Sequence, residues 1–262
     1  MEAVARPYVE DLLARGRHTF TREEAEAALG TSPVATYHAL RRLLKRGWLA
    51  MPRRGFYLIV DPEHRKLGAL PATTWIDDLM RFQRAPYYVA LLSAAALHGA
   101  AHQQPNELQV VTSVVLRPLA VGRVRVRFFF RQRMSRTVTE RMKTSSGYFQ
   151  VSTPETTAFD LVRYRSVGSI DAVATVVSEL AERLDAGRLV ALARKTDGPA
   201  VLQRLGYLLD RTGHEELTAG LSLLVERQKP KFALLEPRST DEVAERNERW
   251  RLDINTSIEV ET

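Results

Sequence analysis

The sequence predicts an α+β protein, with an amino-terminal winged helix-turn-helix domain followed by a larger mixed α+β domain rich in helices towards the carboxyl terminus. Two observations predict this class. Three short helical patterns precede a hairpin pattern in the first 60 residues, and the patterns after residue 153 are mostly helical. The length of 262 residues favours two domains, which we place at residues 1–66 and 71–262 around a proline-containing connector.

The first two helices are predicted from the signals at their ends. One helix follows Pro7, carries apolar side chains at helical spacing and stops at Gly16. Residues 21–24 (TREE) form a capping box, in which the threonine oxygen accepts a backbone hydrogen bond and the glutamate reaches back to the chain. The helix that this box opens is expected to end at Gly30.

The third helix is predicted to open at Pro33 and to end near Arg46. With Leu40 taken as inward and 100° per residue, Tyr37 faces the core and Arg42 faces solvent. The outward face is then small, polar and basic. Such a face suits the major groove of DNA.

A short hairpin follows the third helix. Its apolar runs at 48–51 and 56–60 are joined by Pro-Arg-Arg-Gly at 52–55, which predicts a wing with two arginines at its tip. We expect the third helix to read base edges and the wing to contact phosphate. The candidate DNA-binding residues are Ser32, His38, Arg41, Arg42, Lys45, Arg53 and Arg54.

The positive charge is concentrated in two segments. The net charge is +7, residues 1–66 carry 12 basic and 8 acidic side chains, and residues 113–143 carry nine and one. Clustered positive charge indicates a polyanionic partner, and nucleic acid is the leading one. From Pro33 to Tyr57 there are six bases and no acid. Six phosphate contacts would make log affinity fall with log salt at a slope of about −5.

A basic strand is the most distinctive feature of the second domain. It follows two expected helices, at 75–82 and 89–97, and an expected strand at 107–112. Residues 122–133 then alternate: valine and phenylalanine side chains on one face are expected to pack, and the other face is basic. A merely solvated face on an edge strand is the alternative. The basic face comprises Arg123, Arg125, Arg127, Arg131 and Arg133, with Phe129 among them.

The rest of the second domain is predicted to be helical, with a late strand at 250–255. The helix that opens at residue 153 is expected to start from a capped Thr-Pro-Glu sequence. Four more helices are expected at residues 170–184, 186–194, 200–209 and 216–227.

Catalytic and metal-binding signals are few. His98 and His102 have a spacing that places two ligands on one helix face, but no glutamate follows His98 and no third ligand is evident, so we predict no metal and no cofactor. Phosphate-binding loops, dinucleotide fingerprints and serine elbows are all missing from the sequence. The sequence therefore does not predict an enzyme.

The composition also indicates the cellular location of the protein and excludes several kinds of site. The chain contains no cysteine, which excludes disulfides, thiolate metal sites and a cysteine nucleophile. The longest apolar stretch, residues 87–97, is far shorter than the roughly 20 residues that cross a bilayer, and the amino terminus lacks the pattern of a signal peptide. We expect a cytoplasmic protein with no membrane partner.

Four blocks occur in a characteristic order: RGFYLI (54–59), YYVALLSAAALHGA (87–100), VSTPETTAFDLVRY (151–164) and WRLDIN (250–255). In this order the chain resembles the AbiEi family, the antitoxins and autorepressors of type IV toxin–antitoxin systems that act in abortive infection and phage defence. The resemblance implies a winged helix on operator DNA, at inverted repeats in the chain's own promoter. It also implies a carboxy-terminal domain that counters a nucleotidyltransferase toxin, without a stable complex being required.

The antitoxin surface of that family is basic. The matching stretch here is the basic face between Arg123 and Arg133, which the resemblance assigns to toxin neutralisation. The partner of this face could be the toxin, or an RNA or nucleotide that the toxin also uses.

Two other functions stay open at this point. A solitary winged-helix regulator would use its large domain to sense a ligand or to form oligomers, and the discriminating observation is whether the adjacent reading frame encodes a nucleotidyltransferase. An enzyme acting on nucleic acid would place acids among the basic residues to hold a metal, but residues 113–143 contain only Glu140.

Overall fold

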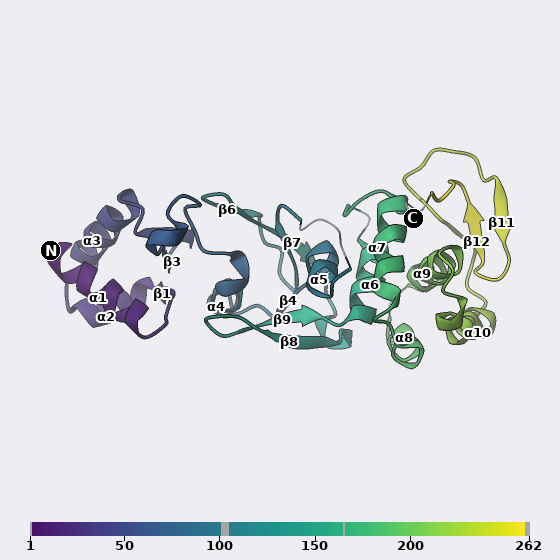
Figure 1. The fold of residues 1–262 in the computed structure, drawn as a ribbon, viewed down its shortest axis with the longest axis horizontal. Helices are drawn as coiled ribbons and strands as arrows, with labels where there is room; N and C mark the ends of the chain where they lie inside the picture. Colours follow the sequence, from purple (N-terminus) through teal and green to yellow (C-terminus); the bar gives the residue numbers. More distant parts are fainter. Residues whose placement is uncertain (1, 101–104, 165, 197, 260–262) are drawn as a thin grey trace. The chain divides into compact units, whose positions relative to one another are not determined.

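The computed structural model describes residues 2–100, 105–164, 166–196 and 198–259, and its ribbon is drawn in Figure 1. It confirms an α+β protein with three sheets. The described chain divides into two compact units, which we treat separately. The first unit comprises residues 1–88, 106–132 and 141–150, and the second comprises residues 89–105, 133–140 and 151–262.

These units do not follow the connector at which we placed a domain boundary. Leu67 and Gly68 belong to the first unit because they contact the turn at Gly122, where the backbone amide of Arg123 donates to the Leu67 carbonyl at 2.8 Å. The domains proposed at 1–66 and 71–262 therefore stay a prediction about independent folding.

The first 60 residues form three helices and a three-stranded antiparallel sheet in the order β1-β3-β2, which is a winged helix. The predicted order of helices and hairpin is confirmed, whereas the short β1 strand was not predicted. The elements are α1 (Glu2–Ala14), β1 (Thr19–Thr21), α2 (Arg22–Leu29), α3 (Pro33–Lys45), β2 (Leu49–Arg53) and β3 (Phe56–Ile59).

Local hydrogen bonds explain where α2 and α3 begin. The Glu24 amide donates to Thr21 Oγ1 at 3.2 Å and the Thr21 amide donates to Glu24 Oε2 at 2.7 Å, which confirms the capping box. Ser32 caps α3 by accepting from the Ala35 amide at 3.3 Å, and Pro33 occupies the first turn. Each of the two helices therefore begins at a side-chain cap that lies directly before its first turn.

The first helix begins earlier than predicted. α1 already spans Pro7, although a proline inside a helix removes one backbone hydrogen bond. Ala5, in the turn before Pro7, is fully buried in the core of the winged helix. We attribute the earlier start to this packing, which offsets the missing bond.

The core of the winged helix is aromatic and aliphatic. The Phe20 ring stacks on Tyr57 with centroids 5.3 Å apart and meets Tyr8 edge-on at 5.5 Å. Leu40 and Leu43 of α3 are buried in the same cluster. The packing of β1 through Phe20 is long-range, which explains why the local pattern did not reveal this strand.

A six-stranded sheet has the order β6-β7-β5-β4-β9-β8. β7 pairs with β5 in parallel and with β6 in antiparallel fashion, so the edge-strand alternative for the basic strand is wrong. The strands are β4 (Tyr87–Val89), β5 (Leu108–Thr112), β6 (Leu119–Val121), β7 (Val124–Phe130), β8 (Thr139–Lys143) and β9 (Tyr148–Ser152).

The helix predicted at 89–97 is a strand followed by a shorter helix, α5 (Leu91–Leu97). Val89 ends β4, where it pairs with Val151 of β9. Ala90 is extended, and Leu91 has a φ of 56°, so the chain turns sharply before the helix begins. The uniformly apolar run fits a buried strand as well as a buried helix, which is why periodicity did not separate them.

The helical prediction for the second unit is confirmed, as is the late strand. The elements are α6 (Pro154–Arg163), α7 (Ile170–Ala181), α8 (Ala186–Ala193), α9 (Pro199–Arg211), α10 (Ala219–Gln228), β10 (Ala233–Leu234), β11 (Glu245–Asn247) and β12 (Leu252–Ile254). The other described helices are α4 (Ile76–Phe82) and the 3-10 turns η1 (Pro62–His64), η2 (Ala72–Thr74), η3 (Met134–Arg136) and η4 (Glu215–Leu217).

The WRLDIN block (residues 250–255) packs on α9 through its tryptophan. Trp250 is fully buried, and its Nε1 donates to Asp210 Oδ2 at 2.6 Å. Gly206 leaves room for the indole, since a Cβ at that position would lie 2.1 Å from the ring. The WRLDIN block is therefore a structural contact of the second unit.

Candidate nucleic-acid interface

An exposed stripe runs along α3 of the winged helix. Tyr37 and His38 are neighbours, and each of them lies three or four residues from Val34 and from Arg41, the spacing of side chains on one helix face; Lys45 follows four residues after Arg41. The stripe combines apolar, aromatic and cationic side chains: Val34, Tyr37, His38, Arg41 and Lys45. The opposite face is buried through Thr36, Ala39, Leu40 and Leu43.

The helix is rotated relative to the prediction. Tyr37, predicted inward, is 45% exposed, and Arg42, predicted outward, is half-buried. The buried side chains centre between Ala39 and Leu40 rather than on Leu40, a rotation of about 50°. The prediction assigned Ala39 to neither face, but Ala39 is buried, and its burial moves the core-facing direction of the helix away from Leu40.

Arg42 consequently lies on the flank of the helix. Its Nε and Nη2 are buried without a hydrogen-bond partner among the described residues. Leaving such donors unsatisfied costs free energy. Arg41, one residue earlier, is exposed on the stripe.

Ser32, the N-cap of α3, and His38, within the helix, have the exposure that was expected. His38 is exposed, and its ring meets the Tyr37 ring at 5.5 Å with an interplanar angle of 66°. Ser32 is exposed while its hydroxyl caps the helix.

The wing is anchored rather than free. Arg53 Nη2 donates to the Arg117 carbonyl at 2.5 Å, and the pKa of Arg53 is lowered by burial and by the nearby positive charge of Arg117. The Phe56 ring packs on Phe82 of α4 at 5.4 Å. Arg53, expected at a phosphate, thus points into the first unit, whereas Arg54 is exposed.

Sequence reasoning missed Arg117. It lies 64 positions from Arg53 in the chain, in an exposed loop between β5 and β6. Nothing in the local pattern around either arginine indicates this contact. The only sequence signal for a role of Arg117 was its position within the basic segment 113–143.

The predicted basic face of β7 is interrupted. Arg123 and Arg125 are exposed, and Arg125 Nη1 donates to the Gly122 carbonyl at 2.8 Å. Arg127 is half-buried, 3.5 Å from Glu107 and 5.0 Å above the Phe129 ring. The five arginines therefore do not form one solvated row.

The last two arginines of that row lie beyond β7. Arg131 Nη1 donates to the Tyr88 hydroxyl at 3.0 Å, and Arg133 belongs to the second unit. Only Arg123 and Arg125 therefore combine the expected exposure with a position in or beside the strand.

The alternation of β7 also fails at its end. Phe129, predicted on the basic face, is 7% exposed, and Phe130, predicted to pack, is 51% exposed. Gln109 and Val111 of β5, the register partners of Arg127 and Phe129, are also buried. The sheet is covered on both faces at this point, as parallel strands usually are.

The residues of the family blocks form internal links. His98 Nε2 donates to the Ser152 carbonyl at 2.7 Å, and the Ser152 and Thr157 hydroxyls are 2.7 Å apart. Glu155 is buried and accepts from the Asp185 amide at 3.2 Å, at the start of α8. His102 lies outside the described residues, and in the described part of the chain no three potential ligands gather into a metal site.

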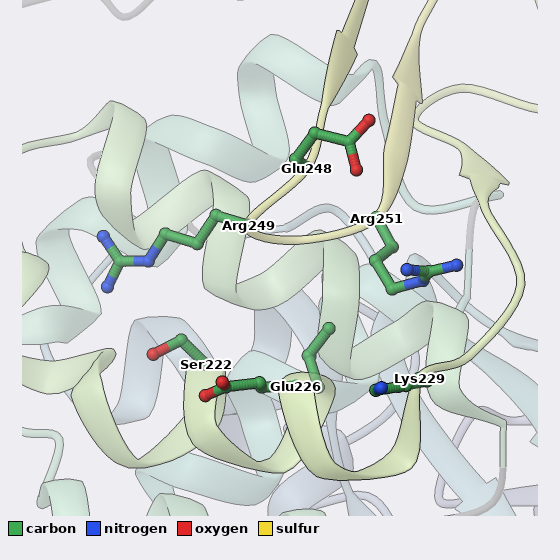
Figure 2. Close-up of a pocket in the computed structure, with 7 residues that line it drawn as sticks. Ser222, Glu226, Lys229, Glu248, Arg249 and Arg251 are labelled. Carbon is green, nitrogen blue, oxygen red and sulfur yellow. The ribbon is translucent and has the colours of Figure 1, made fainter.

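A pocket of about 310 Å³ lies in the second unit and is shown in Figure 2. Side chains of α10 line one side, and the turn before β12 lines the other. Its arginines are engaged: Arg249 Nη1 lies 3.1 Å from Asp210 Oδ2, and Arg251 Nε donates to the Pro230 carbonyl at 2.5 Å. The lining residues are Ser222, Val225, Glu226, Lys229, Glu248, Arg249 and Arg251.

No helix in the described ranges has both the length and the apolar character that a bilayer crossing requires. The winged helix with its exposed cationic stripe, followed by an α+β region, defines a protein of the winged-helix regulator class.

Two family models refine this class. Residues 8–60 match the model described as transcriptional regulator, AbiEi antitoxin, and residues 88–211 match the AbiEi antitoxin C-terminal domain. The chain belongs to the AbiEi antitoxin family. The resemblance inferred from the four sequence blocks is confirmed.

A solved structure shows the same fold. The chain is similar to the RV2827C protein from Mycobacterium tuberculosis, with 20% identity, a TM-score of 0.69 and coverage of 96% of this chain and 91% of that one. An antigenic nucleotidyltransferase-like protein from Paracoccidioides brasiliensis overlaps 60% of this chain and 87% of its own at 11% identity, with a TM-score of only 0.33. A search of curated proteins found no match to the sequence.

Proposed function

We propose that the protein is the antitoxin of a type IV toxin–antitoxin system, which represses its own operon through the winged helix and counters a nucleotidyltransferase toxin through the rest of the chain. The exposed cationic stripe of α3 is the observation that carries the first half. Family membership supports the second half. The protein acts by binding, in the cytoplasm, where its promoter DNA lies.

In this proposal α3 enters the major groove of the operator. Arg41 and His38 reach base edges, since both project from the exposed stripe and carry hydrogen-bond donors. Lys45, near the end of the helix, and Arg54, at the exposed turn of the wing, contact phosphate. Ser32 positions the helix through its cap.

Two of the originally expected contacts take supporting roles instead. Arg53 holds the wing against the Arg117 loop, and Arg42 lies on the flank of α3 with buried nitrogens. The number of exposed cations on α3, directly after it and on the wing then falls from six to four: Arg41, Lys45, Arg46 and Arg54.

A reporter gene under the chain's own promoter tests repression. The full chain is expected to repress it, and Arg41→Glu is expected to abolish repression because it removes a donor to the base edges and brings a negative charge into the groove of polyanionic DNA. Arg188→Glu, at an exposed arginine of α8, is the matched control and should still repress. Full repression by Arg41→Glu, at equal protein level, would contradict the proposal.

Toxin neutralisation is assigned to the exposed start of the basic strand. We expect Arg123→Glu combined with Arg125→Glu to reduce protection of cells from the cognate toxin at least tenfold in survival while repression persists. The backbone at this turn is held by the bond from the Arg123 amide to Leu67, which the substitutions leave intact. Arg127 is left unchanged because its pairing with Glu107 and Phe129 is part of the fold.

The control for this experiment is Arg188→Glu combined with Arg194→Glu. Both arginines are exposed on or beside α8, and the pair produces the same change in net charge. If the strand variant folds and protects as well as the parent, the strand face is merely solvated. An equal loss of protection in both variants would instead attribute the effect to the change in net charge.

A ligand-sensing regulator is the second candidate function, and the 310 Å³ pocket beside α10 is the observation that favours it. It predicts that no nucleotidyltransferase gene lies beside this one. The adjacent reading frame therefore discriminates between the two candidates.

A further inference from the structure

The exposed stripe of α3 is not only cationic. Val34 is 66% exposed and Tyr37 is 45% exposed, although both have large apolar surfaces. They lie in the first two turns of the helix, ahead of Arg41 and Lys45 on the same stripe. Scattered apolar residues on a surface need no explanation, but this pair lies on the face that the proposed function places against DNA.

The position of Val34 and its aliphatic side chain indicate which group on DNA it contacts. Residues near the start of a recognition helix are the ones that contact base edges in the major groove. Among the groups displayed there, the C5-methyl of thymine is the apolar one, and contact with an aliphatic side chain is how it is read. A branched aliphatic side chain at this place therefore matches thymine.

A second copy of this chain fits the stripe less well. Two copies meeting through the same face around a two-fold axis would bring Arg41 and Lys45 towards the same residues of the other copy. Like charges opposed across an interface are unfavourable. The polyanionic DNA surface instead complements the cations while its grooves offer methyl groups to the valine.

We propose that Val34, flanked by Tyr37, reads thymine through its methyl group in the major groove of the operator. This inference rests on the proposed DNA-binding function and adds the base that the apolar part of the stripe selects. Arg41 and His38 supply the polar part of the readout.

The test uses the full chain and its own promoter fragment, synthesised once with thymine and once with deoxyuridine, which lacks only the methyl group. The parent is expected to bind the deoxyuridine fragment at least about fourfold more weakly for each methyl group buried. Val34→Ala should bind the two fragments within twofold of each other. Alanine is a better helix former than valine, so α3 is expected to persist.

Val115→Ala is the matched control. Val115 is 85% exposed in the loop that follows β5, and its loss should leave the preference for thymine unchanged. Light scattering of Val34→Ala should give the same mass as the parent.

The outcomes distinguish a failure of thymine readout from a failure of the proposed DNA-binding function. Salt-dependent binding that does not distinguish the two fragments overturns thymine readout alone. Equal loss of preference in Val115→Ala, or a smaller particle in Val34→Ala, also overturns it. Absence of salt-dependent binding by the parent overturns both statements.

Discussion

Replacing Gly122 by alanine is expected to destabilise the protein by about 3 kcal/mol, the sum of an overpacked contact and a left-handed backbone. Gly122 has a φ of 56°, and a Cβ there would lie 2.0 Å from the Leu67 carbonyl oxygen and 2.7 Å from the Gly68 Cα. These neighbours are backbone atoms, which cannot rotate away. The substitution must therefore separate the turn before β7 from the segment that follows the winged helix.

Gly30→Ala is the control for this prediction. Gly30 has a nearly identical φ of 58°, but nothing lies within 4 Å of a Cβ at that position. It is expected to cost only about 1 kcal/mol, from backbone conformation alone. Urea unfolding of the two variants measures the difference, and equal losses would show that the close approach of Gly122 to residues 67 and 68 is not a real constraint.

Arg41→Met is expected to weaken binding to the chain's own promoter by about 1–3 kcal/mol, or roughly 5- to 150-fold, because it removes a donor from the exposed stripe of α3. Arg42→Met is expected to leave binding within about twofold. It should also keep or raise the free energy of unfolding, since Arg42 Nε and Nη2 are buried without hydrogen-bond partners in the described structure.

The two variants differ by one position in the chain and remove the same charge. A fluorescence anisotropy titration at constant salt compares them directly. Binding losses of similar size would contradict the observed rotation of α3. A larger loss of binding for Arg42→Met than for Arg41→Met would instead support the helix orientation predicted from the sequence, in which Leu40 is at the centre of the inward face.

The sequence predicted those parts of the fold that depend on neighbouring residues. The capping box at Thr21 and Glu24 and the cap and proline that open α3 are short-range signals, and their helices begin where these signals lie. The family blocks identified the family correctly. Several of their residues proved to form internal contacts, such as the Glu155 contact with the start of α8.

The errors have a common physical cause, because each depends on packing between distant segments. The rotation of α3 depends on burial of Ala39, and the direction of the wing depends on Arg53 reaching the Arg117 loop. The strand face at Arg127 and Phe129 was predicted to be an exposed basic surface because the residues that cover it come from elsewhere in the chain. A period of two gives the alternation of a strand, but it does not reveal how many of its faces are covered.

The central claim is that α3 and the exposed part of the wing bind the promoter through their cations. The direct measurement is the affinity of the full chain for its own promoter over a salt series from about 50 to 200 mM. Phosphate contacts by Lys45, Arg54 and the neighbouring exposed Arg46 predict a slope of log affinity against log salt of about −3, reduced in magnitude by about one in Lys45→Met. A slope near zero, or a slope that Lys45→Met leaves unchanged, would contradict the claim.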